Sequence, residues 1–252
     1  MTDQDRMTRL FFELFEGLPR QGPGETFSTL RALALVPGVT STTRILDLGC
    51  GTGAQTRALA KHSPATIVAI DNHPPFVEEL NRRLKAMGVA NRAVAQVGHM
   101  QDLNFAAGTF DLIWCEGAIY VIGFDAGLQA WRPLLKPGGH LVVSEACWTK
   151  PNPPAECRAF WEQEYPAIRD VDAQLDAIAA AGYDTVAHFT LPSDSWWNEY
   201  YKPLTLNLTE FRWRHREDGD ALELADNVQR EIDMWKKYGE FYSYEFFVMK
   251  AG

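Results

Sequence analysis

A short stretch of alternating glycines constrains this chain more than any other feature. Residues 47–53 read Asp-Leu-Gly-Cys-Gly-Thr-Gly, directly after the strand-like residues 44–46 and directly before a helical pattern at 54–62. Glycine lacks a Cβ and tolerates a tight turn, so a ligand can approach the backbone amides at the start of the following helix. The sequence therefore predicts a strand, a glycine loop and a helix that together form one wall of a nucleotide pocket.

The acidic residue at the head of this loop narrows the class of ligand. Gly49, Gly51 and Ala54 also satisfy the dinucleotide fingerprint, which leaves a nicotinamide-dependent oxidoreductase as one alternative. Asp47, however, lies directly before the loop, and a carboxylate suits a cationic ligand better than a pyrophosphate. The string as a whole favours a positively charged nucleotide-like ligand.

With this loop the chain resembles the class I S-adenosylmethionine-dependent methyltransferases, whose first motif has the same form. Two later segments strengthen the resemblance. Residues 110–114 are similar to the fourth strand of that fold, and Leu-Lys-Pro-Gly-Gly at 135–139 is similar to the turn before its fifth strand. The resemblance covers roughly residues 43–146. It implies a Rossmann-like fold, S-adenosyl-L-methionine as the cofactor and methyl transfer as the activity.

The bulk composition excludes several classes of function. The chain has 252 residues, 46% of them hydrophobic and 23% charged, which fits a single methyltransferase domain over residues 1–252. Its formal charge of -9 works against attraction to a polyanion, so nucleic acid is a poor candidate partner. The sequence contains neither a run of about 18 apolar residues nor a charged-then-apolar start, so we expect a cytoplasmic enzyme with no membrane partner.

The cysteines predict neither disulfides nor a metal site. Cys50, Cys115, Cys147 and Cys157 show no CxxC pairing, and no histidine lies at zinc-ligand spacing. We therefore expect free, reduced thiols without chemistry.

The order of strand-like and helical segments predicts the fold class. Strands are expected at residues 43–48, 65–70, 92–97, 110–115, 139–146, 184–191 and 242–249, and helices at 3–18, 26–36, 54–62, 74–87, 125–135, 155–164 and 171–181. Val- and Ile-rich strands that alternate with helix-length segments indicate parallel pairing with right-handed crossovers. We predict an α/β fold with a doubly wound, seven-stranded, mostly parallel sheet.

Two segments fall outside the predicted core sheet of residues 43–191 and 241–250. Residues 1–40 predict an N-terminal helical cap, in which Gln-Gly-Pro-Gly at 21–24 separates two helices. Residues 192–240 predict a helical, aromatic-rich insertion before the last strand, where this fold needs only a short link. We expect both segments to set acceptor specificity. Whether the insertion is a mobile lid or the contact of a homodimer stays open.

Candidate cofactor-binding residues follow from the loops at the carboxyl ends of the strands, where ligands bind in open α/β sheets. Asp71 ends the second strand about 20 residues after Gly51, the spacing of an acid that accepts hydrogen bonds from ribose hydroxyls. The resemblance places adenine against the third loop, where His99 stands in place of the family's frequent aspartate. The full predicted set is Gln21, Gly24, Asp47, Gly49, Cys50, Gly51, Gln55, Thr56, Asp71, Asn72, His99, Met100 and Glu116.

Catalytic candidates lie in the fourth loop, which in this fold would stand beside the transferred methyl group. Methyl transfer is an in-line displacement that depends chiefly on alignment and on the exclusion of water, so not every acceptor requires a general base. We identify Glu116 and Tyr120 as catalytic candidates, with a purely structural role for Glu116 as the alternative. Tyr201 and Glu145 are further candidates for the pocket wall.

The predicted function is transfer of a methyl group from S-adenosylmethionine to a small-molecule acceptor, mainly through positioning. The aromatic insertion and the acidic charge favour an aromatic molecule or a cationic amine, with Trp196 and Trp197 at the acceptor. Two alternatives stay open: a non-catalytic S-adenosylmethionine-binding or regulatory module, and the nicotinamide-dependent oxidoreductase.

Overall fold

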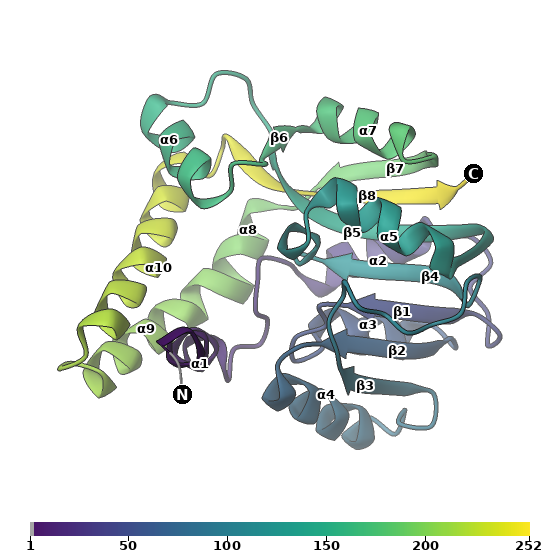
Figure 1. Cartoon of the computed structure of the whole chain (residues 1–252), viewed down its shortest axis with the longest axis horizontal. Coiled ribbons are helices and arrows are strands. Elements are labelled where there is room, and N and C mark those ends of the chain that lie inside the picture. Colours follow the sequence, from purple (N-terminus) through teal and green to yellow (C-terminus); the bar gives the residue numbers. More distant parts are fainter. Residues whose placement is uncertain (1–2) are drawn as a thin grey trace.

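One twisted sheet organises the computed structural model, which describes residues 3–252 (Figure 1). Residues 1 and 2 of the predicted N-terminal cap lie outside the described part. The strands are β1 (Arg44–Leu48), β2 (Thr66–Asp71), β3 (Ala93–Val97), β4 (Phe110–Glu116), β5 (Leu135–Trp148), β6 (Arg169–Asp170), β7 (Tyr183–Thr190) and β8 (Tyr242–Ala251). Their order is β3-β2-β1-β4-β5-β8-β7, with β6 beside β5.

Parallel pairing dominates this sheet. The neighbours from β3 through β5 all run parallel, whereas β8 lies antiparallel between β5 and β7. The strand order reverses between β1 and β4, so the loops after these two strands diverge and leave a crevice at the carboxyl edge. The predicted doubly wound, mostly parallel fold is confirmed. The sheet also has an eighth strand, β6, which the sequence did not predict. Its two residues are too few to give a periodic sequence signal.

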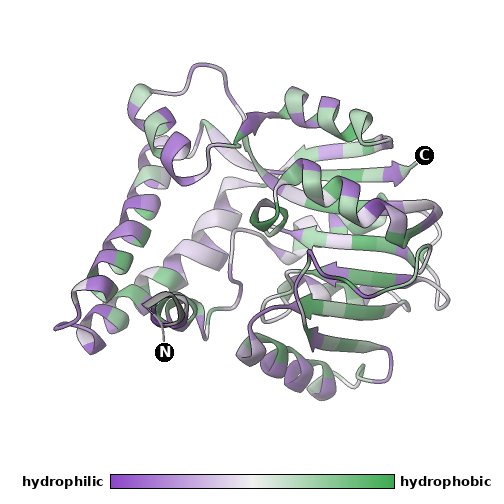
Figure 2. Cartoon of the chain, viewed as in Figure 1, coloured by the Kyte–Doolittle hydropathy of each residue, from purple (hydrophilic) through white to green (hydrophobic). Residues whose placement is uncertain are grey.

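Helices cover both faces of the sheet. One face packs against α2 (Thr26–Ala34), α3 (Ala54–His62) and α4 (Pro74–Ala86), and the other packs against α5 (Phe124–Trp131) and α7 (Val171–Ala180). In α4, for example, Phe76, Leu80 and Leu84 recur at every fourth position and are buried. Figure 2 shows the matching pattern, with hydrophobic strands inside and a hydrophilic outer side on α4.

A helical lobe stands beyond the carboxyl ends of the parallel strands (Figure 1). It contains α1 (Asp3–Phe15), α6 (Ala155–Glu164), α8 (Ser193–Trp196), the π-helical η3 (Trp197–Tyr201), α9 (Lys202–Arg214) and α10 (Gly219–Tyr238). Arg6 of α1 forms ion pairs with Asp218 and Asp220 at the start of α10. The Asn207 amide donates to the Leu14 carbonyl at 3.0 Å. Segments from the two ends of the sequence therefore form one lobe.

The start of β5 differs from the sequence-based expectation. Helix α5 ends at Trp131, a short 3-10 turn, η2 (Arg132–Leu134), follows, and β5 begins at Leu135 rather than at residue 139. Pro133 has no N–H to continue the α-helical hydrogen bonds, which explains the early end of α5. The 135–139 segment joins the strand, and its register against β4 shifts between Phe110 and Leu112. A second 3-10 turn, η1 (Ile119–Val121), follows β4.

Among residues 3–252, no helix combines the length and the apolar character that crossing a bilayer requires.

Candidate functional site

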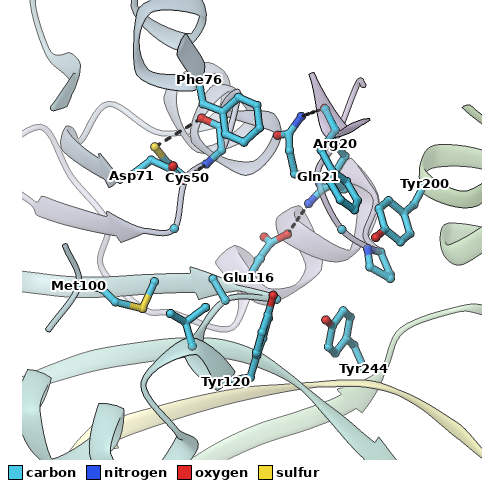
Figure 3. Close-up of a pocket in the computed structure, with 18 of the residues that line it drawn as sticks. Arg20, Gln21, Cys50, Asp71, Phe76, Met100, Glu116, Tyr120, Tyr200 and Tyr244 are labelled. Atoms are coloured by element: carbon cyan, nitrogen blue, oxygen red, sulfur yellow. Dashed lines mark hydrogen bonds and ion pairs between the residues drawn. The ribbon is translucent and has the colours of Figure 1, made fainter. Parts of the chain in front are cut away.

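A cavity of about 460 Å³ lies at the carboxyl edge of the sheet, beneath the helical lobe. Its walls come from the loops after β1 to β4, the end of β5, the linker after α1, and residues of α6, α8, η3, α10 and β8. Figure 3 shows Cys50, Asp71 and Met100 on one side of this space and Tyr120, Tyr200 and Tyr244 on the other, with Glu116 between them. The cavity thus has a nucleotide side, built by the sheet, and an aromatic side, built largely by the lobe.

Two positions of the glycine loop lie too close to neighbouring atoms to accommodate a side chain. Gly49 has a φ of 69°, and a Cβ there would lie 2.4 Å from the Ala118 Cβ. Gly51 has a φ of 52°, and a Cβ there would lie 2.5 Å from the Gln21 side-chain oxygen. Both positions therefore need glycine for conformation and for space. The loop leaves its backbone in the cavity wall, as the sequence predicts.

Asp71 at the end of β2 faces the cavity with acceptor capacity left over. Its Oδ2 accepts from the Gly51 amide at 2.8 Å, and its Oδ1 accepts from the His73 amide at 3.0 Å. A carboxylate has about four acceptor positions, so two remain for a ligand. Burial raises the pKa of Asp71, while these backbone hydrogen bonds lower it. The residue is positioned to accept hydrogen bonds from a diol.

The third loop closes the nucleotide side. Asn72, His99, Met100 and Gln101 line the cavity there, together with Phe76 of α4. The Met100 carbonyl already accepts from the Trp131 indole at 3.0 Å. The Met100 thioether side chain reaches into the space, where it can contact a ligand (Figure 3).

The linker between α1 and α2 crosses the cavity as a strap. The Gln21 side-chain oxygen accepts from the Thr52 amide at 2.8 Å and from its hydroxyl at 3.1 Å. The Arg20 guanidinium donates to Glu116 Oε2 at 2.8 Å. The strap is therefore fastened both to the glycine loop and to the fourth loop.

Three donors take up most of the hydrogen-bonding capacity of Glu116. Besides Arg20, its Oε1 accepts from the Thr29 hydroxyl at 2.7 Å and from the Trp114 indole at 2.8 Å. These contacts join the end of β4 to the strap and to α2. The geometry supports the structural role that the sequence left open, although Glu116 does line the cavity.

Three predicted cofactor residues do not line the cavity. Asp47 is fully buried behind the glycine loop, where it accepts from Thr56 and, at 3.3 Å, from Gln55. Thr56 points at Asp47 and is equally buried. Gly24 packs under the Arg20 side chain, and its amide donates to the Ser195 carbonyl. These residues support the loops that line the cavity. The remaining predicted residues, Gln21, Gly49, Cys50, Gly51, Gln55, Asp71, Asn72, His99, Met100, Glu116 and Tyr120, all line it.

The aromatic insertion divides between the cavity and the core. Trp196 lines the cavity, and its ring stacks on Tyr244 with centroids 5.2 Å apart. Trp197 instead stacks on Trp235, with centroids 6.0 Å apart, outside the cavity lining. Tyr200 lines the cavity, whereas the fully buried Tyr201 donates its hydroxyl to Glu231. Neighbouring positions in this segment therefore have different surroundings.

Several cavity residues had escaped the sequence reasoning. Arg20 precedes the predicted strap directly, and Tyr244 alternates with Tyr242 and Phe246 along the last strand. The lobe also contributes Trp161, Glu164, Tyr165, Val228 and Glu231. Val228 lies on the buried face of α10, and a helical period alone does not distinguish a residue that meets the core from one that meets the cavity. Among residues 3–252, no group of three or more His, Cys, Asp or Glu side chains is arranged to hold a metal ion.

Comparisons with known proteins bear on this geometry. A family model described as a methyltransferase domain matches residues 45–139, which span the glycine loop and strands β1 to β4. The sterol 24-C-methyltransferase of Kluyveromyces lactis is 26% identical over 195 residues, which cover 72% of this chain and 53% of that protein. The chain spans about half the length of the first curated relatives it matches.

Solved structures agree over nearly the whole chain. A methyltransferase from Thiobacillus denitrificans, in complex with S-adenosyl-L-homocysteine, superposes with a TM-score of 0.83 and 21% identity, covering 97% of this chain and 98% of that one. Residues 45–139 therefore form a methyltransferase domain, and the whole chain has the fold of the class I S-adenosylmethionine-dependent methyltransferases. The [4+2]-cyclase SpnF has the same fold, with a TM-score of 0.78 and 18% identity over 98% of this chain and 93% of that one. Class I methyltransferase architecture alone therefore does not fix the reaction of this member.

Proposed function

We propose that this methyltransferase transfers a methyl group from S-adenosylmethionine to a small organic acceptor. The observation that carries the proposal is the division of one cavity into two sides. The glycine loop, Asp71 and the third loop form a side suited to a nucleoside, and aromatic residues of the lobe and of β8 form the other side. A methyl donor and its acceptor need such adjoining sites.

The described residues fit the family's cofactor. Asp71 has two free acceptor positions for the ribose hydroxyls, and the glycine loop leaves no Cβ in the way. Asn72, Phe76 and Met100, which line the cavity beside Asp71, would hold the adenine ring, and Gln21 and Gln55 would lie beside the methionine part. When bound, S-adenosylmethionine supplies a methyl group on a positively charged sulfur, which is already activated for displacement. The chain's own contribution is to orient the acceptor and to exclude water.

The cavity limits the acceptor to a small molecule. The helical lobe and the strap cover the cavity, and the formal charge of -9 disfavours nucleic acid. Tyr120, Tyr200 and Tyr244 offer faces for apolar contact and hydroxyls for hydrogen bonds. We place Tyr120 among the acceptor-contacting residues, and Glu116 as the residue that fixes the strap.

Binding and transfer experiments test this proposal. Calorimetric titration should give S-adenosylhomocysteine binding and no comparable binding of a nicotinamide dinucleotide. Incubation with radiolabelled S-adenosylmethionine and a panel of small amines, phenols, thiols and acids should transfer label to at least one class. Dinucleotide binding without S-adenosylhomocysteine binding would favour the oxidoreductase. Cofactor binding without any transfer would favour a regulatory module or a non-methylating reaction such as that of the cyclase.

We also propose that the protein works in a reducing compartment, the cytoplasm. All four cysteines are free and buried, and free thiols are usual where glutathione and thioredoxin act. Mass spectrometry of protein alkylated during cell lysis should find four modified thiols, and a disulfide would contradict the proposal.

A further inference from the structure

The aromatic side of the cavity is also its acidic side. The carboxylates that line the cavity are Asp71, Glu116, Glu145, Glu164 and Glu231, whereas the one guanidinium among the lining residues is that of Arg20. Arg20 is 6% exposed and forms an ion pair with Glu116, so these two charges offset each other. Glu145, Glu164 and Glu231 remain on the side away from Asp71. No Lys or Arg side chain of the cavity lining pairs with these three carboxyl groups.

Glu145 has an acceptor atom with no partner. The residue lies near the end of β5 with 0% of its surface exposed, and it lines the cavity. Its Oε1 accepts from the Ala146 amide at 2.7 Å, but its Oε2 has no hydrogen-bond partner. Buried polar atoms almost always have a partner, so an orphan acceptor in a cavity wall indicates a missing donor.

Tyr165 stands next to this orphan atom. Its hydroxyl is close enough to lower the pKa of Glu145 by weak hydrogen bonding, but the contact falls short of full hydrogen-bond geometry, and neither oxygen has another partner. A group with several N–H donors could bridge the two oxygens. A neutral apolar ligand would leave both atoms without a hydrogen-bond partner, which disfavours its binding.

Glu231 of α10 supplies a second carboxylate to the same compartment. Its Oε1 accepts from the Tyr201 hydroxyl at 2.9 Å, which fixes the side chain at the cavity wall. Around the two carboxylates lie the rings of Trp161, Tyr200 and Tyr244. Aromatic faces next to buried carboxylates are a favourable setting for an organic cation.

We propose that the methyl acceptor is a small organic amine whose ammonium group binds to the free oxygen of Glu145, with Tyr165 as a second hydrogen-bonding partner and Glu231 as a second negative charge. This inference deepens the proposed function and rests on it. It excludes acidic acceptors, because a carboxylate ligand would meet Glu145, Glu164 and Glu231 without a free cation in the lining.

The titration of Glu145 agrees with this role. Burial raises the pKa of Glu145 to about 8, while the Ala146 amide, Tyr165 and Arg169 lower it. A carboxyl with that pKa is mostly neutral in the empty site at pH 7, and a neighbouring ammonium favours its charged form. An amine must be unprotonated to act as a nucleophile. Glu145 is a better proton acceptor than an ordinary glutamate, because its pKa is closer to that of an amine.

Two sets of probes with matched shapes test the inference by binding alone. Phenethylamine, 2-phenylethanol and phenylacetate share one skeleton, and pentylamine, 1-pentanol and pentanoate share another. Each is titrated calorimetrically into the protein with and without S-adenosylhomocysteine. We expect at least one amine to bind about tenfold or more tightly than its alcohol, and the carboxylates to bind weakest. An alcohol that binds as tightly as its amine in both sets, a carboxylate that binds more tightly, or no amine binding would overturn the inference.

Variants locate the ammonium. Glu145→Gln should weaken binding of the amine about 10- to 100-fold, the effect of losing a hydrogen bond to a charged group, and leave the alcohol unchanged. The control Glu162→Gln changes an exposed carboxylate on the same α6 that carries Trp161, and it should leave both unchanged. Circular dichroism and S-adenosylhomocysteine binding verify that Glu145→Gln is folded. Undiminished amine binding by folded Glu145→Gln protein would contradict the assignment.

These readouts also separate the inference from the proposed function. If S-adenosylhomocysteine binds and label passes only to neutral acceptors, the amine inference fails and the methyltransferase proposal stands. If the amines bind through Glu145 but S-adenosylhomocysteine does not bind, the proposed function fails while the ammonium site remains.

Discussion

At the scale of single residues, the site depends on carboxylates whose surroundings give them different tasks. Asp71 keeps two acceptor positions free toward the cavity, Glu116 is held by three donors, and Glu145 has one orphan oxygen. Asp71 and Glu116 end their strands, and Glu145 lies three residues before the end of β5, at the same edge of the sheet. Their positions in the sequence do not distinguish the roles of these three carboxylates, but their hydrogen-bond partners do.

Asp71→Asn should weaken cofactor binding while the fold persists. The asparagine oxygen can still accept from the Gly51 amide, but an amide nitrogen then faces the ribose hydroxyls. We expect the calorimetric Kd of S-adenosylhomocysteine to rise about 10- to 100-fold, as for a lost hydrogen bond to a charged group. The control is Asp102→Asn, an exposed change outside the cavity lining. Equal affinity of the Asp71 variant and wild type would remove the ribose assignment.

Glu116→Gln should lower stability more than a catalytic role alone would predict. It leaves the Arg20 guanidinium, 6% exposed, without its anion. Breaking one side of a buried ion pair typically costs about 3–5 kcal/mol. The free energy of unfolding from urea titration measures this cost. Glu210→Gln removes an exposed partner of Arg214 and should cost at most about 1 kcal/mol. A stable Glu116 variant that binds cofactor normally but has lost transfer would restore the catalytic interpretation.

At the scale of elements, the connection from β1 to α3 contains a buried titrating group. Asp47 at the end of β1 accepts from Thr56 and Gln55 in the first turn of α3 and so ties the two elements together. Burial nevertheless raises the pKa of Asp47 to about 7, from 3.8 in the unfolded chain. At pH values between 3.8 and about 7, Asp47 is therefore protonated in the folded state and ionised in the unfolded state.

Stability should accordingly fall as pH rises from about 4 to about 7, because the folded state binds more protons than the unfolded state in that range. Asp47→Asn removes this dependence, which is of the order of 4 kcal/mol for the fully buried group. A shallower fall toward about 8 should remain, since Glu145 titrates in the same direction. Urea unfolding across this pH range measures the slope, with the exposed Asp184→Asn as control. An unchanged slope in the Asp47 variant would show that Asp47 is ionised throughout.

Elements also mark the limit of what the sequence could predict. The alternation of apolar strands with helices gave the sheet, and the glycine pattern located the cofactor side, since both depend on local spacing. Trp196 in the cavity wall and Trp197, partly buried against Trp235, are adjacent helical positions that point about 100° apart. Which of the two directions meets the cavity depends on tertiary packing, which the local pattern does not show. The partners of Glu116 lie 87 and 96 residues away in the chain, at Thr29 and Arg20, and local patterns carry no information at that range.

At the scale of the whole molecule, the lobe and the sheet share one core. Leu14 of α1, Phe211 of α9 and Val142 of β5 belong to the same cluster of buried residues. The cavity takes its walls from both parts. Ligand binding and global folding are therefore coupled.

We expect a single calorimetric unfolding transition that shifts upward with S-adenosylhomocysteine. At about 100 times the Kd, binding adds about 2.7 kcal/mol, which for a chain of this size corresponds to a rise in Tm of about 5–10 °C. Two separate transitions, of which only one moves, would show that the lobe folds apart from the sheet.

The antiparallel placement of β8 has a consequence for how this architecture can diversify. The helical segment leaves the sheet after β7 and returns in β8, and these two strands are direct neighbours, with Thr190 opposite Glu245. Its entrance and exit therefore lie side by side, and a replacement of different length could be spliced between them without disturbing strand register. New acceptor specificity could then evolve by replacement of the segment between β7 and β8 alone, while the nucleotide side of the cavity stays unchanged.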